Sequence, residues 1–261
     1  MNEAHPPALT SALLLEKGFR HAFFTREGGV SLPPWDSLSF VVATGDDPAV
    51  VLENRRRAAR TLGVPVEKLY YLSQVHGTVA RLLTGEEPWD EVLRSPGDIT
   101  VSRTPGVGCA VRSADCVTVL LGEVESGAVA AIHSGWKGTV VNAVNAGVCA
   151  LREAIGSPAR SEIVAAVGPH IERCCFEVGD DVAAQLAACS PLGEGAVLRG
   201  GAKARVDLRR IIHAQLEAAG IAASAIDDVP GCTVCDSGRF FSYRRDGQVG
   251  GRLLSAIAVR A

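Results

Sequence analysis

The sequence has few aromatic residues, no excess of basic charge and no apolar run long enough to span a membrane. Aromatic residues are 5% of the chain, so Val, Ala, Leu and Ile must fill most of the interior. The formal net charge is −3, whereas nucleic acids and membrane surfaces bind proteins through an excess of basic residues. No uninterrupted apolar stretch reaches the roughly 18 residues of a membrane-spanning helix. We therefore expect neither a nucleic-acid-binding protein nor a membrane protein.

A secretion signal is also missing from the first residues. The segment from Met1 to Pro7 has no basic stretch followed by a long apolar run. We therefore expect a cytoplasmic protein whose eight Cys stay reduced and act as packing residues, metal ligands or nucleophiles. Cys109, Cys149 and Cys189 lie among Ala and Val, and we interpret them as small buried hydrophobic residues.

The chain does contain many short apolar segments, which alternate irregularly with helical patterns. The 261 residues are 47% hydrophobic, which is enough for a sizeable core. Strands are expected at residues 22–26, 69–76, 107–112, 117–121, 129–133, 163–167 and 253–259, and helices at 47–62, 139–155, 180–188 and 208–219. Residues 84–97 are rich in turn formers and are expected to form a surface loop. Since no composition break divides the chain, the sequence predicts one α/β domain over residues 1–261, with partly antiparallel strands and helices covering the sheets.

Three residues that commonly bind metals lie at or beside the ends of strand-like runs. The segments that carry them are Gln74–Gly77, Ser113–Cys116 and His133–Gly138. Two imidazoles and one thiolate, from His76, Cys116 and His133, would hold a zinc ion and leave a fourth position for water or substrate, as catalytic zinc requires. A lone His is more often an ordinary hydrogen-bonded residue, so this pattern indicates a metal site without establishing it.

Four further Cys form two short pairs, Cys174–Cys175 and Cys232–Cys235. A C-x-x-C motif combined with an adjacent Cys pair is not a standard four-Cys zinc pattern. A redox-active C-x-x-C normally precedes a helix, whereas Asp236-Ser237-Gly238 follows here and indicates a turn. We therefore expect both pairs to be structural.

Several cationic side chains are candidates for binding phosphate or carboxylate. Arg26 precedes a Gly-Gly turn, Arg55 lies in an expected helix and Arg244 follows an aromatic strand. Lys137 lies in the Gly-rich turn after His133, which leads into an expected helix whose N-terminus favours anions. That turn lacks the spacing of a Walker loop. The sequence does not show whether these cations meet in one pocket.

Several of these segments, with others, resemble the ordered signatures of the YfiH/YlmD family, also called the laccase-domain or polyphenol-oxidase family. They are Gln-Val-His-Gly at 74–77, Ala-Asp-Cys at 114–116, His-Ser-Gly-Trp-Lys-Gly at 133–138, Gly-Pro-His-Ile at 168–171 with Cys-Cys-Phe-Glu-Val at 174–178, and Phe-Ser-Tyr-Arg-Arg-Asp-Gly at 241–247. The resemblance starts near Thr25 and covers nearly the whole chain. Two segments depart from the family's pattern, at three positions. The 133–138 segment usually has Ala and Arg in place of Ser134 and Lys137. In the other segment, a small residue or Cys is expected in place of His170. The side chain of His170 could be a ligand, a proton shuttle or neither.

The resemblance implies a single domain in which mixed β-sheets are sandwiched between helices, in four α/β/β/α layers. It also implies that His76, Cys116 and His133 hold a catalytic Zn²⁺, with copper as the less favoured ion. Family members phosphorolyse adenosine, inosine and 5′-methylthioadenosine, and they deaminate adenosine. We therefore expect a monomer that acts on small molecules, as a transferase and a hydrolase. The candidate substrate-binding residues are Arg26, Arg55, Gln74, Asp115, Lys137 and Arg244, and Asp115 is also a candidate proton shuttle or orienting residue.

Three other functions are considered. Copper-dependent phenol oxidation is disfavoured, because a blue-copper site and a trinuclear cluster need many His-x-His pairs, whereas this chain has six His and no such pair. A cysteine- or metal-dependent amidase that edits cell-wall precursors such as UDP-muramoyl-L-serine would use Cys116 as nucleophile and His76 or His133 as base. A non-catalytic module that only retains the fold is the third alternative.

Overall fold

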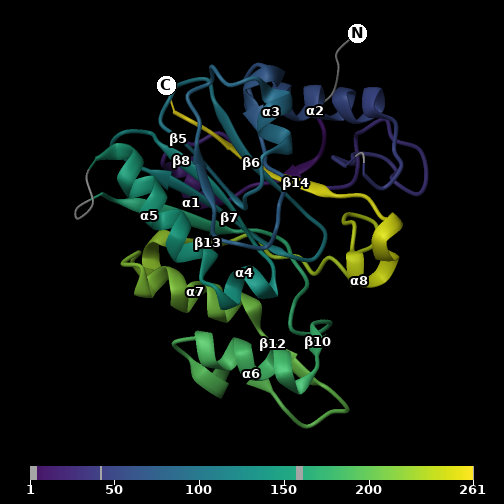
Figure 1. The fold of residues 1–261 in the computed structure, drawn as a ribbon, viewed down its shortest axis with the longest axis vertical. Coiled ribbons are helices and arrows are strands. Elements are labelled where there is room, and N and C mark those ends of the chain that lie inside the picture. Colours follow the sequence, from purple (N-terminus) through teal and green to yellow (C-terminus); the bar gives the residue numbers. More distant parts are fainter. Residues whose placement is uncertain (1–4, 42, 157–160, 261) are drawn as a thin grey trace.

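Two β-sheets lie face to face in the computed structural model, which describes residues 5–41, 43–156 and 161–260 (Figure 1). The first sheet has the order β1-β2-β14-β6-β3, and the second has the order β13-β9-β7-β8-β5-β4. The strands of the first sheet are β1 (Ala8–Leu9), β2 (His21–Phe24), β14 (Leu253–Ala258), β6 (Gly108–Ser113) and β3 (Leu69–Tyr70). Those of the second are β13 (Ile226–Asp228), β9 (Ile163–Val167), β7 (Val117–Glu123), β8 (Val129–Ser134), β5 (Ile99–Ser102) and β4 (Ala80–Leu82). Both sheets mix parallel and antiparallel pairs.

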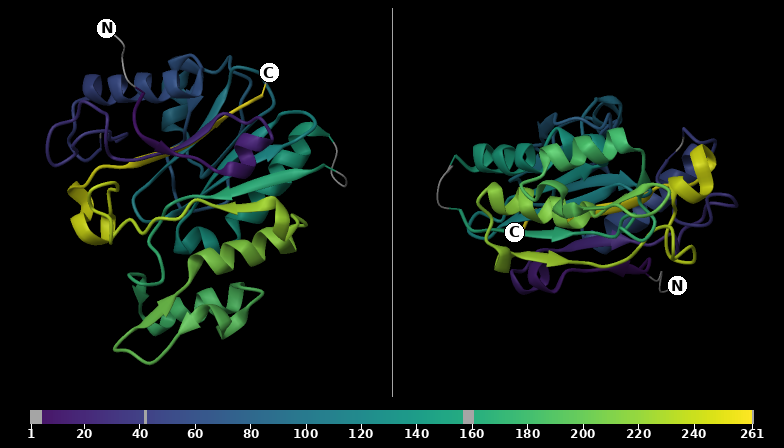
Figure 2. Two further views of the ribbon diagram at one scale, coloured as in Figure 1. Left: turned by 180° about the vertical axis from the view of Figure 1, so that it is seen from behind. Right: turned by 90° about the horizontal axis from the view of Figure 1, so that it is seen from below.

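Helices cover the outer faces of both sheets, as the two views in Figure 2 also show. Helix α2 (Pro48–Leu62) packs its Ala58 and Leu62 against the first sheet, and α5 (Ala143–Ile155) and α7 (Leu208–Ala218) pack against the second. A separate apolar cluster fills the space between the two sheets. Its members include Phe19, Phe23, Val111, Leu120, Ala131 and Ile257. Burying each large apolar side chain in these clusters contributes about 1.5–3 kcal/mol. The order helix, sheet, sheet, helix confirms the predicted α/β/β/α layering.

The other helices and strands are short. The helices are α1 (Ala12–Glu16), α3 (Trp89–Arg94), α4 (Trp136–Val140), α6 (Asp180–Cys189) and α8 (Tyr243–Asp246). A small third sheet contains β10 (Glu177–Val178), β12 (Ala204–Val206) and β11 (Val197–Leu198), and it lies with α6 at the lower end of the molecule in Figure 1. Short 3₁₀ turns occur at Val66–Lys68, Gly193–Ala196, Ala223–Ala225 and Gly247–Val249.

Three predicted elements differ from the structure. The helix expected over 139–155 is divided into α4 and α5, because Asn142 adopts φ 58° and its side chain accepts a hydrogen bond from Asn145 N–H to start the second helix. The strand expected over 69–76 ends at Tyr70, where its pairing with β6 stops, and Ser73 makes only an isolated bridge to Pro96. The surface loop expected over 84–97 contains α3, which is too short to show a helical period in the sequence.

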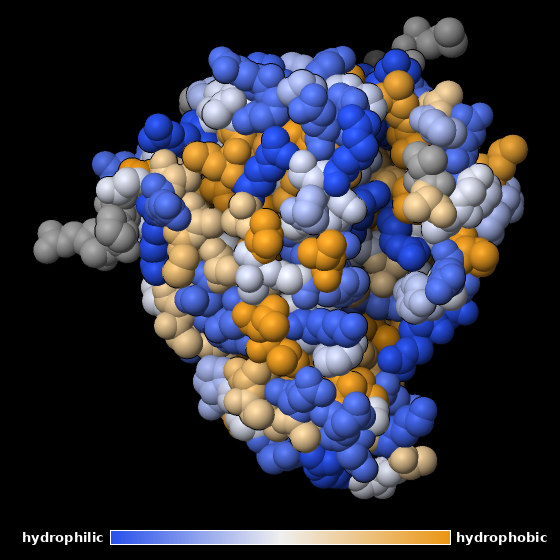
Figure 3. All heavy atoms as spheres, in the orientation of Figure 1, coloured by the Kyte–Doolittle hydropathy of each residue, from blue (hydrophilic) through white to orange (hydrophobic). Residues whose placement is uncertain are grey.

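The surface agrees with most of the composition argument. No helix in the described ranges is long and apolar enough to cross a membrane. Figure 3 shows polar and apolar residues interspersed over one face of the molecule. Cys109 is buried as predicted, but Cys149 is exposed on α5 and Cys189 is half-buried, so the prediction of buried packing was wrong for Cys149. Ala and Val neighbours do not distinguish the buried side of a helix from its exposed side.

Candidate functional site

Strand pairing brings two distant parts of the chain to the end of β8. Val117 of β7 pairs with Ser134 of β8, and Ile99 of β5 pairs with Ile132 on the other side of β8. Cys116 comes one residue before β7, and Asp98 comes one residue before β5. Both residues therefore flank the end of β8 that carries His133.

His76 reaches the same place on a loop that folds over the carboxylate of Asp98. That buried carboxylate accepts hydrogen bonds from the backbone N–H groups of Val75 at 3.2 Å, His76 at 2.9 Å and Gly77 at 2.7 Å. His76 has φ 61°, which is uncommon for a residue other than Gly. The three hydrogen bonds to Asp98 hold the loop in this conformation, which directs the imidazole toward Cys116.

The three predicted ligands form one group. Their donor atoms lie within 4.8 Å of one another, and the Sγ of Cys116 is 3.7 Å from Nε2 of His76. Nδ1 of His133 is 2.8 Å from Oδ1 of Asp98, so Nδ1 carries the proton and Nε2 is left to bind an ion. A Cβ at Gly135 would lie 2.7 Å from the Cys116 sulfur, so only Gly leaves room for the group. Two imidazoles, one thiol and a carboxylate behind one imidazole are a donor set that fits Zn²⁺.

Electrostatic interactions favour the charged forms of Cys116, His133 and Asp98. Burial opposes ionisation of the Cys116 thiol, but the nearby imidazole of His133 lowers the thiol's pKa to about 6. Burial also opposes protonation of His133, but the Cys116 thiolate and the hydrogen bond to Asp98 raise the imidazole's pKa to about 9. The hydrogen bonds from His133 and from the His76–Gly77 backbone outweigh burial and lower the pKa of Asp98. Cys116 is therefore a thiolate at neutral pH, which is the form that binds metals.

A cavity of about 710 Å³ opens beside this group, a size typical of small-molecule sites. Apolar side chains line part of the wall; they include Val41, Ile171, Phe176 and Leu208. The polar and charged lining includes Gln74, Arg112, Asp115, Lys137, Arg244 and Arg252. Four cations against one carboxylate in this lining favour an anionic ligand.

Two of the predicted substrate-binding residues lie elsewhere. Arg55 is buried under α2, where its guanidinium donates two hydrogen bonds to the carbonyl of Leu69 and lies 4.3 Å from the ring centre of Trp89. Arg26 donates to the carbonyls of Asp36 and Ser237 and stacks on Phe241. Neither residue lines the pocket, so the structure does not bring them to the ligand group. Arg is as often a structural cap for carbonyl groups as a ligand for anions, and the sequence does not separate the two roles.

Two others, Gln74 and Asp115, line the pocket and also brace it. Asp115, at φ 87°, accepts a 2.6 Å hydrogen bond from the hydroxyl of Thr233 and another of 2.6 Å from the backbone N–H of Arg244. The Gln74 amide donates to the carbonyl of Arg112 and accepts from its N–H. Because both oxygens of Asp115 already accept hydrogen bonds, the geometry favours a positioning role over proton transfer.

Lys137 and Arg244 also line the pocket. Lys137 is exposed in α4, with Nζ 5.6 Å from the ring centre of Trp136. Arg244 is the second residue of α8 and donates from its guanidinium to the carbonyls of Cys175 and Glu177. The structure therefore brings Lys137, Arg244, Gln74 and Asp115 to the ligand group, and leaves Arg26 and Arg55 out.

Sequence reasoning missed three residues of the site: Asp98, Arg112 and Arg252. Asp98 lies just after the segment predicted to be a loop, and its only signal is an acidic residue directly before an apolar strand. Arg112 donates to the carbonyls of Phe40 and Leu72, while its Nε is buried without a hydrogen-bond partner among the described residues. Burial, followed by the charge of Arg112, lowers the pKa of Arg252. No motif in the sequence marks either guanidinium.

His170 does not belong to the pocket. Its side chain is fully buried, and its Nδ1 lies 2.8 Å from the carbonyl of Gly168. It is neither in the ligand group nor in the pocket lining. Of the roles considered for it, the structure therefore excludes those of ligand and proton shuttle at this site.

Comparisons with known proteins agree on the kind of molecule this is. Residues 20–260 match the family model described as multi-copper polyphenol oxidoreductase laccase. A purine nucleoside phosphorylase of Streptomyces coelicolor is 38% identical over 89% of this chain and 93% of its own. The purine nucleoside phosphorylase YfiH of Escherichia coli is 36% identical over 92% and 94%. The crystal structure of YlmD from Geobacillus stearothermophilus superposes with a TM-score of 0.86 at 32% identity, and covers 94% of this chain and 93% of its own.

Proposed function

The chain belongs to the multi-copper polyphenol oxidoreductase laccase family, and on this basis we propose that it is a metal-dependent purine nucleoside phosphorylase. Membership confirms the resemblance to YfiH and YlmD that the motifs indicated. The observation that carries the proposal is the convergence of His76, Cys116 and His133 on a cavity lined by cations. The names of the relatives support purine nucleosides as substrates.

Zn²⁺ is the ion we propose for the three ligands. When bound, it supplies Lewis acidity, which polarises an oxygen of phosphate or sugar and makes water acidic. His133 would bind through Nε2, because Asp98 holds its Nδ1 proton, and Cys116 would bind as the thiolate. Only two of the six His, His76 and His133, belong to this group, which argues against the several copper ions of a laccase.

The cationic wall fits phosphate, the second substrate of a phosphorylase. Arg112 and Arg252 lie close enough that the charge of one lowers the pKa of the other, and a bound anion would relieve that repulsion. In phosphorolysis, a phosphate oxygen forms a bond to the anomeric carbon, while the purine leaves with the electron pair of the N-glycosidic bond. Cations that hold phosphate beside the sugar stabilise the charge that develops in this step. Phe176, Ile171 and Leu208 offer an apolar surface for the purine or sugar.

We propose adenosine, inosine and 5′-methylthioadenosine as the substrates, with deamination of adenosine as a second reaction at the same site. The ligand group is also where attack on C6 of adenine would take place. A thiolate such as that of Cys116 is protected from oxidation in reducing surroundings, so we propose that the protein acts in the cytoplasm.

The Cys116–His133 pair also favours a second candidate, an amidase acting on cell-wall precursors. A thiol whose pKa is lowered to about 6 beside an imidazole is the arrangement of a cysteine nucleophile and its base. In that reaction the sulfur would form a bond to the substrate's carbonyl carbon, the amine would leave with a proton from the imidazole, and water would then release the acid. The ligand atoms are the same, so the two candidates differ in their need for a metal ion.

Phosphate dependence tests the proposal directly. We expect inosine to yield hypoxanthine and ribose 1-phosphate only when inorganic phosphate is present, and the reaction to stop when a chelator removes the ion. UDP-muramoyl-L-serine, assayed in parallel, should remain intact. Amide cleavage that persists in chelator, together with no phosphorolysis, would replace the phosphorylase with the cysteine amidase. Phenol oxidation supported by several coppers per chain would favour a laccase.

Activation by Zn²⁺ should depend on pH. Between pH 6 and pH 9, the ion-free pair holds one proton on His133 beside the Cys116 thiolate, and Zn²⁺ must displace that proton. The affinity for Zn²⁺ is therefore expected to rise about tenfold per pH unit between pH 6 and pH 9 and to level off above pH 9. Below pH 6 the affinity should fall more steeply, because the thiol of Cys116 is also protonated there. The measurement is the free Zn²⁺ that restores half of the activity to metal-depleted protein at each pH. A flat profile from pH 6 to pH 9 would argue against the ion pair.

A further inference from the structure

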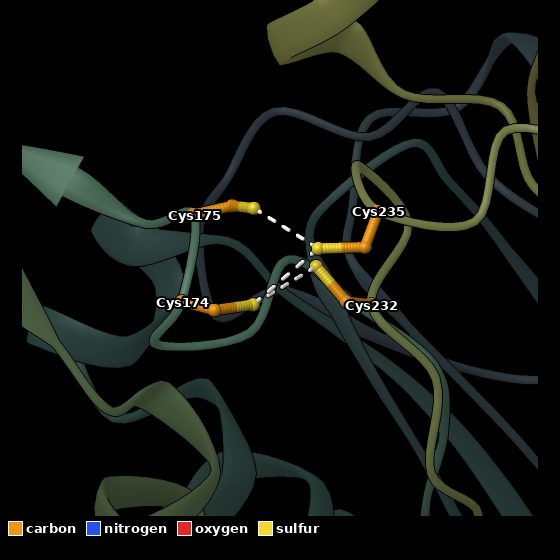
Figure 4. Close-up of side chains that lie close together, drawn as sticks. All are labelled: Cys174, Cys175, Cys232 and Cys235. Atoms are coloured by element: carbon orange, nitrogen blue, oxygen red, sulfur yellow. Dashed lines mark hydrogen bonds between the residues drawn. The ribbon is translucent and has the colours of Figure 1, made fainter.

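Four thiols outside the active site converge on one point. Cys174 and Cys175 project from one segment, and Cys232 and Cys235 from another, with all four sulfurs within 4.8 Å of one another (Figure 4). The Sγ of Cys174 lies 3.6 Å from those of both Cys232 and Cys235, and the Sγ of Cys175 lies 3.3 Å from that of Cys235. The two pairs were predicted to be structural from sequence, and nothing in their spacing indicated that they meet.

These separations match a tetrathiolate metal site better than disulfides. A disulfide requires sulfurs about 2.05 Å apart. Sulfurs bound tetrahedrally at about 2.3 Å from Zn²⁺ lie about 3.8 Å from one another. The closest separations here are 3.3 to 3.6 Å, and one sulfur, that of Cys235, approaches both members of the opposite pair. A pairwise disulfide arrangement would instead bring each sulfur close to a single partner.

The fold explains why the two segments meet. Strands β9 and β13 are parallel neighbours, and the chain that leaves each strand at the same edge of the sheet stays beside the other. The backbone N–H of His170 donates to the carbonyl of Gly231 at 3.1 Å, and that of Thr233 donates to the carbonyl of His170 at 3.0 Å. This parallel bridge comes four residues before Cys174 and directly at Cys232. The side chains of both pairs are therefore delivered to one place by well-paired backbone.

A backbone hydrogen bond closes the turn that carries Cys232 and Cys235, because the N–H of Asp236 donates to the Cys232 carbonyl at 3.0 Å. This turn presents both of its sulfurs to Cys174, whose Sγ lies 3.6 Å from each of them. Two Cys separated by two residues on one turn form one half of many four-thiolate zinc sites.

We propose that Cys174, Cys175, Cys232 and Cys235 bind a structural Zn²⁺ that is separate from the ion of the active site. Four protein ligands close the coordination sphere, so this ion would stabilise structure and would have no position for substrate. Each thiol loses its proton to the solvent as it binds, and the ion replaces up to four protons. No disulfide forms and no electron is transferred.

The proposed ion would fasten one wall of the pocket. Phe176, which lines the cavity, directly follows Cys175, and the carbonyl of Cys175 accepts a hydrogen bond from the Arg244 guanidinium. On the other segment, Thr233 follows Cys232 and donates its hydroxyl to Asp115. The cluster therefore joins the two segments that position Arg244 and Asp115. Its loss should disorder this wall while leaving His76, Cys116 and His133 in place.

Metal content of four proteins tests the assignment. The proteins, purified in reducing buffer with Zn²⁺ as the only added metal, are the unaltered chain, Cys116→Ala, Cys232→Ser/Cys235→Ser, and the combination of the three substitutions. We expect about two, one, one and no bound ions per chain, respectively. Cys149→Ser, which changes an exposed Cys outside both groups, is the control and should bind as the unaltered chain does. The Cys232/Cys235 pair is tested by the metal content of the Cys116→Ala background, with no activity assay. The result therefore does not depend on the proposed phosphorylase activity.

Coordination of the ion retained by Cys116→Ala distinguishes the outcomes even if the double variant does not fold. X-ray absorption at the zinc edge should show only sulfur neighbours at about 2.3 Å. Nitrogen or oxygen neighbours, or the absence of any ion in Cys116→Ala, would overturn the proposal. A Cys174–Cys232 or Cys175–Cys235 disulfide would also overturn it. Each such disulfide would lower the mass of the protein purified in reducing buffer by two hydrogens. Loss of this ion in Cys232→Ser/Cys235→Ser should raise KM more than it changes kcat. The reason is that the wall binds substrate, whereas the group of His76, Cys116 and His133 is untouched.

Discussion

Replacing Cys116 with Ala is expected to lower kcat/KM for phosphorolysis of inosine about 1,000-fold. The substitution removes the only thiolate of the ligand group, whose other members, His76 and His133, lie within 4.8 Å of it. Lewis-acid catalysis contributes several kcal/mol, and each 1.36 kcal/mol is a factor of ten in rate, so about 4 kcal/mol corresponds to the stated loss. The measurement is the initial rate of hypoxanthine release at varied inosine and saturating phosphate, alongside the metal content of the same sample.

Cys149→Ala is the matched control for this substitution. It makes the same chemical change at an exposed Cys of α5, which belongs to neither group of potential metal ligands, and it should leave the rate and the metal content unchanged. Undiminished turnover by Cys116→Ala, with one ion fewer per chain than the unaltered protein, would remove both the metal-dependent reaction and the cysteine amidase. Loss of activity with the same metal content as the unaltered protein would point to a nucleophilic thiol instead.

Replacing Asp98 with Asn should weaken the active-site ion about 10- to 100-fold and also destabilise the protein. Asp98 is fully buried, and its carboxylate accepts a hydrogen bond from Nδ1 of His133 and from three backbone N–H groups of the His76 loop. Partners behind a metal-bound imidazole typically contribute this factor to affinity. An Asn side chain offers one acceptor oxygen and turns an N–H₂ group toward the remaining donors. Breaking a buried charged network of this kind costs about 3–5 kcal/mol of the free energy of unfolding.

Two measurements separate the effects of Asp98→Asn. The free Zn²⁺ that restores half of the activity reports the site, and urea unfolding of metal-depleted protein reports the free energy of unfolding. Asp90→Asn is the control, because Asp90 is half-exposed on α3 and pairs with Arg94 at the surface, which makes a change of less than about 1 kcal/mol the expected result. Unaltered zinc activation in Asp98→Asn would show that the carboxylate does not hold His133 for binding.

The contrast between Cys116 and Asp98 shows what sequence reasoning reaches in such a site. Cys116, His76 and His133 are marked by their own chemistry and by short flanking motifs, so they were named from the sequence. Asp98 has no motif, because it acts on groups that lie 21 to 35 residues away along the chain. The same limit explains Arg55, which satisfies the carbonyl of Leu69, and Arg112, which the structure places in the pocket wall. The guanidinium of an Arg can bind either backbone carbonyl groups or anionic ligands, and the packing of the folded chain decides which of these it meets.

Local rules in the chain were enough to identify the alternation of strands and helices, the extent of α2, expected over 47–62 and found over Pro48–Leu62, and the three ligands at or beside strand ends. These features depend on neighbours within a few residues, through capping, periodicity and backbone preferences. The register of β7, β8 and β5 that joins Cys116 to His133 and Asp98, and the parallel course of β9 and β13 that unites four thiols, came only from the folded molecule. Such pairings are chosen by how whole sheets bury their faces against each other, which is a property of the complete core and is not encoded in any one segment.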